Sequence, residues 1–157
     1  MTFVFGALVL AFLCHGCGSR QADANAVNPS AGVSQEDFVK RAEGLLAQKN
    51  YDAAVRLFQE IIAKDPNNVQ AHFALGQTFM RLESYNNALQ QFEAVTNLAP
   101  TNNEAFLLLG GCYDLLGDRP KAIELVKKSV EVAQAKRDEE GFKRSVIILQ
   151  QMMAKEQ

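Results

Sequence analysis

Two cysteines near the N-terminus have a spacing that redox motifs and haem-attachment motifs use. Cys14 and Cys17 are separated by two residues in the stretch LCHGCGSR. Redox-active pairs of this kind lie at a helix start within a βαβ unit, whereas this pair follows a run of apolar residues. Haem attachment needs a histidine directly after the second cysteine, and Gly18 occupies that position. We therefore expect neither chemistry at this pair.

The rest of the chain offers no catalytic or metal-binding combination of residues. Beyond residue 17 it has one histidine, His72, and one cysteine, Cys112. We find no second ligand at metal spacing and no glycine-rich phosphate loop. We predict that His72 packs as an aromatic side chain and that Cys112 is a buried thiol. The protein is predicted to be no enzyme and to need no metal or cofactor.

Composition indicates a protein that buries a core and has little attraction for nucleic acid. The chain of 157 residues is 48% hydrophobic and 22% charged, with a formal net charge of −2. These proportions are ordinary for a globular domain. A balanced charge provides no basic field for phosphates, so we expect no nucleic-acid partner.

Residues 1–16 are predicted to be an export signal. The stretch TFVFGALVLAFLC is apolar, and the first charged residue of the chain is Arg20. As a helix, 13 residues would reach about 20 Å, which is short of the ~30 Å hydrocarbon core. A removable signal therefore fits better than a membrane-spanning helix.

The end of this segment resembles the lipobox of bacterial lipoproteins. In that motif a cysteine after a small residue is lipidated and becomes the mature N-terminus, and residues 16–19 (Gly-Cys-Gly-Ser) match it. The resemblance implies lipidation at Cys17 and a membrane-anchored location in the bacterial cell envelope. Two alternatives stay open: an ordinarily cleaved signal with export to the periplasm, and an uncleaved short anchor.

Residues 17–34 are predicted to be a flexible tether. From Ser19 onwards the text reads SRQADANAVNPSAGVS, which has almost no large apolar residue to bury. A random coil of these 16 residues would span roughly 20 to 25 Å. Such a tether would hold a folded domain clear of a lipid surface.

The remaining sequence repeats itself every 34 residues. YDAAVRLFQEIIAKDPNN begins at Tyr51, and YNNALQQFEAVTNLAPTN begins at Tyr85. Within a unit, apolar residues recur every three or four positions, which predicts two helices joined by a short turn. Capping chemistry at Thr101 predicts one helix start. Three columns at this period hold small or aromatic residues: Ala42, Gly76 and Gly110; Ala54, Ala88 and Ala122; Phe38, His72 and Phe106.

Residue types and spacing together resemble the tetratricopeptide repeat. The residues that match its signature are Leu75, Gly76, Phe79, Tyr85, Ala88, Phe92 and Pro100. The resemblance implies an all-α fold, a right-handed α-solenoid of three helix-turn-helix pairs at residues 35–68, 69–102 and 103–136. Residues 137–157 would then form a C-terminal capping helix, as the ends of solenoids require.

The predicted C-terminal helix has one apolar stripe. Phe142, Val146, Leu149 and Met153 recur at helical spacing. Covering the exposed end of the stack is the simplest use for this stripe. A truncated fourth repeat and a dimerisation helix remain alternatives.

The family resemblance implies a protein-binding wall on the first helix of each pair. Carried over by position, its residues are Val39, Glu43, Leu46, Phe73, Ala74, Gln77, Met80, Leu107, Leu108, Gly111 and Leu115. A mostly apolar wall suits an amphipathic or extended apolar peptide. The cations with which some family members grip anionic C-terminal tails are absent. The alternative is that the chain itself covers this surface.

We therefore predict a non-enzymatic scaffold or adaptor that binds a protein or peptide partner. Its organisation is similar to that of repeat lipoproteins that help pilus or outer-membrane machinery to assemble. The alternative is a structural homodimer that pairs through the C-terminal helix and has no separate client.

Overall fold

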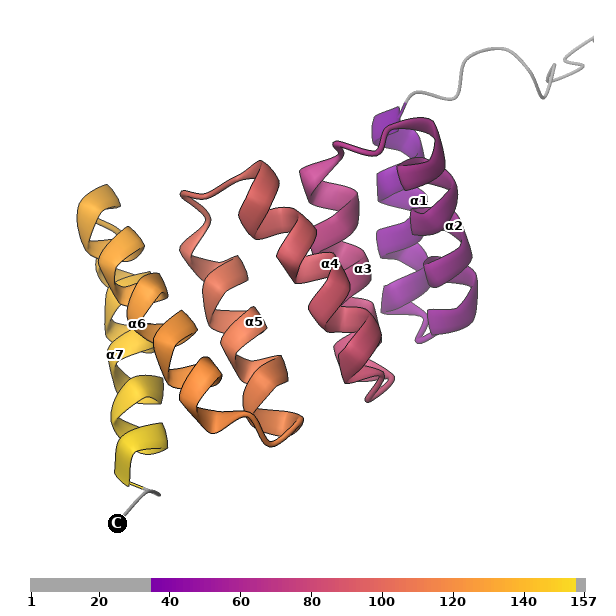
Figure 1. Cartoon of the computed structure of the whole chain (residues 1–157). Helices are drawn as coiled ribbons and strands as arrows, with labels where there is room; N and C mark the ends of the chain where they lie inside the picture. The colour runs from indigo at the N-terminus through magenta and orange to yellow at the C-terminus, as the bar shows by residue number, and fades with distance from the viewer. Residues whose placement is uncertain (1–34, 155–157) are drawn as a thin grey trace, which may run out of the picture. The chain divides into compact units, whose positions relative to one another are not determined.

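Seven α-helices joined by short turns make up the part of the chain that the computed structural model describes, residues 35–154 (Figure 1). No strand occurs within these residues. The predicted export signal, the tether and Cys17 lie outside them. The helices are α1 (Gln35–Ala47), α2 (Tyr51–Lys64), α3 (Val69–Arg81), α4 (Tyr85–Leu98), α5 (Asn103–Leu115), α6 (Arg119–Lys136) and α7 (Glu139–Ala154).

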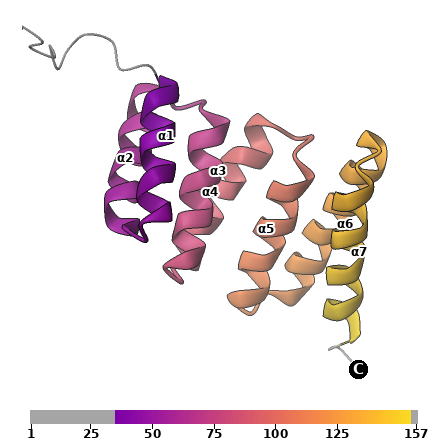
Figure 2. The same ribbon diagram turned by 180° about the vertical axis from the view of Figure 1, so that it is seen from behind.

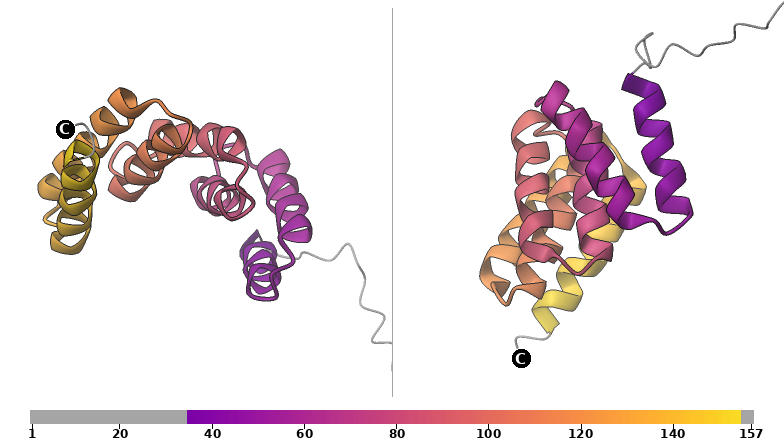
Figure 3. Two further views of the ribbon diagram at one scale, coloured as in Figure 1. Left: turned by 90° about the horizontal axis from the view of Figure 1, so that it is seen from below. Right: turned by 90° about the vertical axis from the view of Figure 1, so that its right-hand side faces the viewer.

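Helices α1 to α7 pack in chain order. Each helix contacts the one before it and the one after it, and the only further substantial contact in residues 35–154 joins α5 and α7. Figure 3 shows a curved row in which α2, α4 and α6 lie on the outer side. Figure 2 views the opposite, inner side, with α1, α5 and α7 towards the viewer. Nearest-neighbour packing of helix pairs is the organisation of a solenoid, so the predicted all-α solenoid is confirmed.

Side-chain caps and turn conformations divide the sequence into these helices. Five helices are preceded by an asparagine or aspartate whose side chain accepts a hydrogen bond from the amide three residues later: Asn50, Asn68, Asn102, Asp118 and Asp138. These bonds satisfy amide donors that the first turn leaves unpaired. The cap of α5 is therefore Asn102 and not the predicted Thr101.

Glycines allow the first and second helices of a pair to approach closely. A Cβ atom at Gly76 would lie 2.7 Å from the ring of Phe92. At Gly110 it would lie 2.8 Å from a methyl group of Val126. Phe92 and Val126 are fully buried. The small residues in this column are thus explained by contact between the helices of each pair.

The seventh helix packs against α6 with a face shifted from the predicted stripe. Its buried residues are Gly141, Ser145 and Met152. Met153, which the stripe included, is 48% exposed. The position of α7 that corresponds to Gly110 on α5 is Val146, because both lie seven residues after the helix start. Val146 is bulkier than the glycines that occupy this position in α3 and α5.

Candidate protein-binding site

The eleven predicted wall residues lie on the three helices that begin the pairs, α1, α3 and α5. These helices line the inner side of the curved row (Figure 3). None of the helices in residues 35–154 is both long enough and apolar enough to span a bilayer. The chemistry available on the inner side therefore depends on how much of each side chain the fold leaves uncovered.

Two of the predicted wall residues are largely buried in the core. Val39 is only 6% exposed and packs in the cluster formed by α1, α2 and α3. Leu107 is 7% exposed and belongs to a cluster that includes Met152 of α7. At Leu107 the expectation of an open wall must be corrected, because the chain's own last helix helps to bury this side chain.

Most other apolar residues of the wall are half-buried. Phe73, Met80 and Leu108 pack against a core between α3, α4 and α5. The ring of Phe73 meets the ring of Phe92 edge to face, with 5.9 Å between centroids. Leu46 and Ala74 pack in the same way against the first core. These residues offer a partner only part of their surface.

The open part of the wall lies on α5. Leu115 is 54% exposed. One turn earlier, a Cβ atom added to Gly111 would meet no atom within 4 Å, so this glycine faces free space. Of the two polar wall residues, Glu43 is exposed and Gln77 is half-buried. An apolar segment could therefore contact the protein most directly at the end of α5.

Ile147 extends this open surface onto α7, and the sequence prediction missed it. Ile147 is 53% exposed and lies eight residues after the start of its helix, as Gly111 does on α5. The two residues therefore occupy equivalent positions on two helices that contact each other. The sequence could have indicated this residue, because Ile147 is an apolar residue outside the predicted stripe of the helix. It is recognised as part of the inner face only when α7 is aligned with α5.

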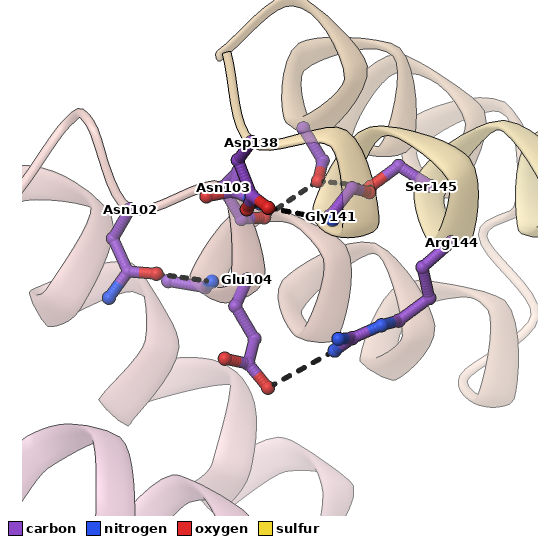
Figure 4. A network of polar contacts seen from close by, with 9 residues as sticks. Asn102, Asn103, Glu104, Asp138, Gly141, Arg144 and Ser145 are labelled. Carbon is purple, nitrogen blue, oxygen red and sulfur yellow. Dashed lines mark hydrogen bonds and ion pairs between the residues drawn. The ribbon is translucent and has the colours of Figure 1, made fainter. Parts of the chain in front are cut away.

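A buried polar network fixes α7 beside α5 and α6 (Figure 4). The side-chain amide of Asn103 donates to Asp138 at 3.0 Å, and the backbone N–H of Gly141 donates to the other oxygen at 2.9 Å. The bond from Gly141, followed by that from Asn103, lowers the pKa of the Asp138 carboxyl. The hydroxyls of Ser129 and Ser145 lie 2.8 Å apart in the same interface.

A polar cavity of about 340 Å³ opens beside this network, between α5 and α7. Leu107 contributes to its lining, together with charged residues from both helices. Glu104 and Arg144 form an ion pair across it at 3.6 Å, and both side chains are about half exposed. Such an exposed pair contributes little stability and can exchange partners.

The histidine and the cysteine have structural surroundings. The ring nitrogens of His72 lie 2.8 Å from the side-chain oxygen of Gln91 on α4 and 3.0 Å from the carbonyl oxygen of Pro66 in the turn before α3. His72 thus makes polar contacts with both segments, which the prediction of aromatic packing did not include. Cys112 is buried, and this burial raises its thiol pKa to about 11. Within residues 35–154, no group of three potential ligand residues is arranged to hold a metal ion.

One curated relative and two solved structures illustrate what the chain is similar to. It is 27% identical over 121 residues to the CTR9 homolog of Arabidopsis thaliana, a match that covers 74% of this chain but only 11% of that protein. PcrH of Pseudomonas aeruginosa, solved with the chaperone-binding region of PopD, has a TM-score of 0.74 at 20% identity, covering 80% of this chain and 98% of PcrH.

The second structure is the type III secretion chaperone SycD of Yersinia enterocolitica in complex with a peptide of the translocator YopD. Its TM-score is 0.72 at 16% identity, covering 78% of this chain and 94% of SycD. Likenesses at this identity show the fold alone. The family model for the tetratricopeptide repeat matches residues 39–103 and 73–138, which together make up more than half of the chain. The chain therefore belongs to the tetratricopeptide repeat family.

Proposed function

We propose that this protein is a non-enzymatic scaffold whose inner face binds an apolar or amphipathic peptide segment of a partner protein. The observation that carries the proposal is the open apolar surface at the end of α5, where Leu115 is 54% exposed and Gly111 faces free space. Solvent-exposed leucine beside an unfilled position is a surface that gains free energy when a partner covers it.

Proteins of similar fold give independent support for a peptide as the ligand. The PcrH structure contains the chaperone-binding region of PopD, and the SycD structure contains a peptide of YopD. Both are similar to this chain over about four fifths of its length. This chain has a similar arrangement of helices to those peptide complexes, but the residues on its inner face are different.

Affinity capture from native membranes tests this function. The bait is the full chain, compared with a Leu115→Glu variant and with Gln90→Glu as a matched control on an exposed position of α4. A charge at Leu115 should abolish capture of the partner, whereas the control should retain it. Equal capture by all three proteins would show that the inner end of α5 is not used.

We further propose that the protein is tethered to a membrane of the bacterial cell envelope through Cys17, where it would recruit partners into pilus or outer-membrane assembly. The proposal rests on the lipobox-like residues 16–19 and on the apolar run before them. Cys17→Ser should release the protein from sedimented membranes. A variant that still sediments with membranes would exclude lipidation at this thiol as the anchor.

A structural homodimer is the second candidate, and two features of α7 favour it. Met153 is 48% exposed, and an apolar cavity of about 350 Å³ adjoins Phe142 at the other end of the helix. A second copy could cover both features. Measurement of the mass in solution distinguishes the candidates, because a monomeric mass for the full chain excludes this one.

A further inference from the structure

We propose that Gly111, Leu115 and Ile147 form a slot that receives one bulky apolar side chain of the bound segment, which also presents an acidic residue to Lys143. The inference rests on the proposed function and names the partner's chemistry. It also moves the binding site from α1 and α3 towards α5 and α7.

Helix geometry places Gly111 and Leu115 on one face of α5, and Ile147 lies at the equivalent position of α7. Gly111 and Leu115 are four residues apart on α5, so they lie on the same face one turn apart. Ile147 occupies on α7 the position that Gly111 occupies on α5. Gly141 and Ser145 confirm this alignment, because they are buried like their counterparts Ala105 and Leu109.

Exposure separates the slot from the rest of the wall. Leu115 and Ile147 are 54% and 53% exposed, the highest values among large hydrophobic residues in the described chain. At Gly111, one turn before Leu115, an added Cβ atom would meet nothing within 4 Å, which leaves a gap on this face of α5. The adjacent Gly110 is different, since Val126 lies against it. The gap at Gly111 is therefore free to hold a side chain supplied from outside.

Charges around Ile147 favour an acidic residue on the partner. A cavity of about 430 Å³ on α7 is lined by Ile147 and by four charged residues, Glu139, Glu140, Lys143 and Arg144. The two glutamates lie in the first turn of α7, where the helix dipole offsets their negative charge. Arg144 is paired with Glu104. Of the two cations that line this cavity, Lys143, one turn before Ile147, is the one for which the described residues show no ion pair.

Selection from a random library of 12-residue peptides displayed on phage, with the full chain in detergent as the target, tests the slot. The enriched peptides should share a bulky aliphatic or aromatic residue and a nearby acidic residue. Their affinity is then measured for the wild type and for Gly111→Trp, which fills the slot. Gly44→Trp is the matched control, because a Cβ atom at Gly44 on α1 also meets nothing within 4 Å.

We expect Gly111→Trp to weaken binding by about tenfold or more, since the partner's apolar side chain loses its place of burial. Gly44→Trp should leave the affinity within about twofold. Lys143→Glu should shift the selected peptides from an acidic to a basic residue. Circular dichroism and thermal melting of each variant establish that it is folded.

The failures of the two proposals are distinguishable. Suppose that the peptides bind Gly111→Trp as tightly as wild type but bind the Gln77→Arg variant on α3 more weakly. This result would overturn the slot and leave the inner-face function standing. Selection of no peptide, or of peptides insensitive to both variants, would overturn both. Self-association that Ile147→Ser abolishes would show that a second copy occupies the slot and would also overturn the proposal.

Discussion

Two adjacent glycines of α5 are expected to respond to alanine in opposite ways. Replacing glycine with alanine inside a helix gains about 0.5–1 kcal/mol, because the unfolded chain loses conformational freedom. At Gly111 the added methyl group meets no atom within 4 Å, so the full gain should appear. At Gly110 the same methyl group would lie 2.8 Å from Val126 and 3.0 Å from the backbone oxygen of Ala122.

The size of the difference follows from the contact at Gly110. Overpacking of a buried contact costs about 1–3 kcal/mol, and a backbone oxygen cannot rotate away as a side chain could. The helix-propensity gain is common to both variants and cancels in the comparison. Gly110→Ala should therefore be less stable than Gly111→Ala by about 1–3 kcal/mol.

Urea unfolding followed by circular dichroism at 222 nm measures this difference. The two variants need the same slope against denaturant, because only then does a shifted midpoint report a change in stability. If Gly110→Ala proves at least as stable as Gly111→Ala, the close packing of α5 on α6 described here is incorrect.

Three further predictions concern turns, pH and thiol reactivity. Lys49→Gly and Glu83→Gly should each raise the free energy of unfolding by about 0.5–1 kcal/mol in urea melts, because both residues have a left-handed backbone with φ near +60° that glycine adopts more readily; unchanged midpoints would contradict this. Because the pKa of Asp138 is lowered in the folded state, the ionised carboxylate stabilises the fold fully above its ordinary pKa, and this stabilisation is lost as the pH falls through the folded-state pKa. Below about pH 4 the wild type should therefore lose more stability than Asp138→Asn. Parallel pH profiles of the two proteins would count against the network. With the two N-terminal cysteines replaced by serine, Cys112 should react with Ellman's reagent at pH 8 only on unfolding, since burial raises its pKa to about 11; a rapid reaction in the folded state would disprove its burial.

The fold could be predicted because its determinants are local and repeated. Each 34-residue unit places a small residue such as Gly76 opposite a large one such as Phe92, and the structure brings these two into contact. Turn positions repeat as well, since Lys49, Glu83 and Gly117 lie 34 residues apart and all have positive φ. Periodic contacts of this kind are visible in one sequence without any knowledge of long-range packing.

The docking of α7 could not be predicted in the same way. Ser129 and Ser145 are fully buried and lie 2.8 Å apart, yet each serine alone reads as a surface residue. Arg119 stands where the family has tyrosine, and its guanidinium lies 2.9 Å from a carboxylate oxygen of Asp114 and donates to the carbonyl oxygen of Met152. Such pairs depend on the angle between helices, which the helical period does not determine.

The wall was predicted by position, and position does not determine exposure. Leu107 and Leu115 both belong to the inner face of α5, but one is 7% and the other 54% exposed. The difference arises because Leu107 shares a cluster with Met152 of α7. The seventh helix thus covers one part of the wall and adds Ile147 to another.

Photo-crosslinking tests most directly whether the inner face holds a polypeptide. Benzoylphenylalanine would replace Leu115 at the open end of α5 or, as the control, Gln90 on the outer row, each in the full chain in native membranes. We expect a discrete crosslinked product from position 115 and none from position 90. No product at 115, or the same products at both positions, would contradict it.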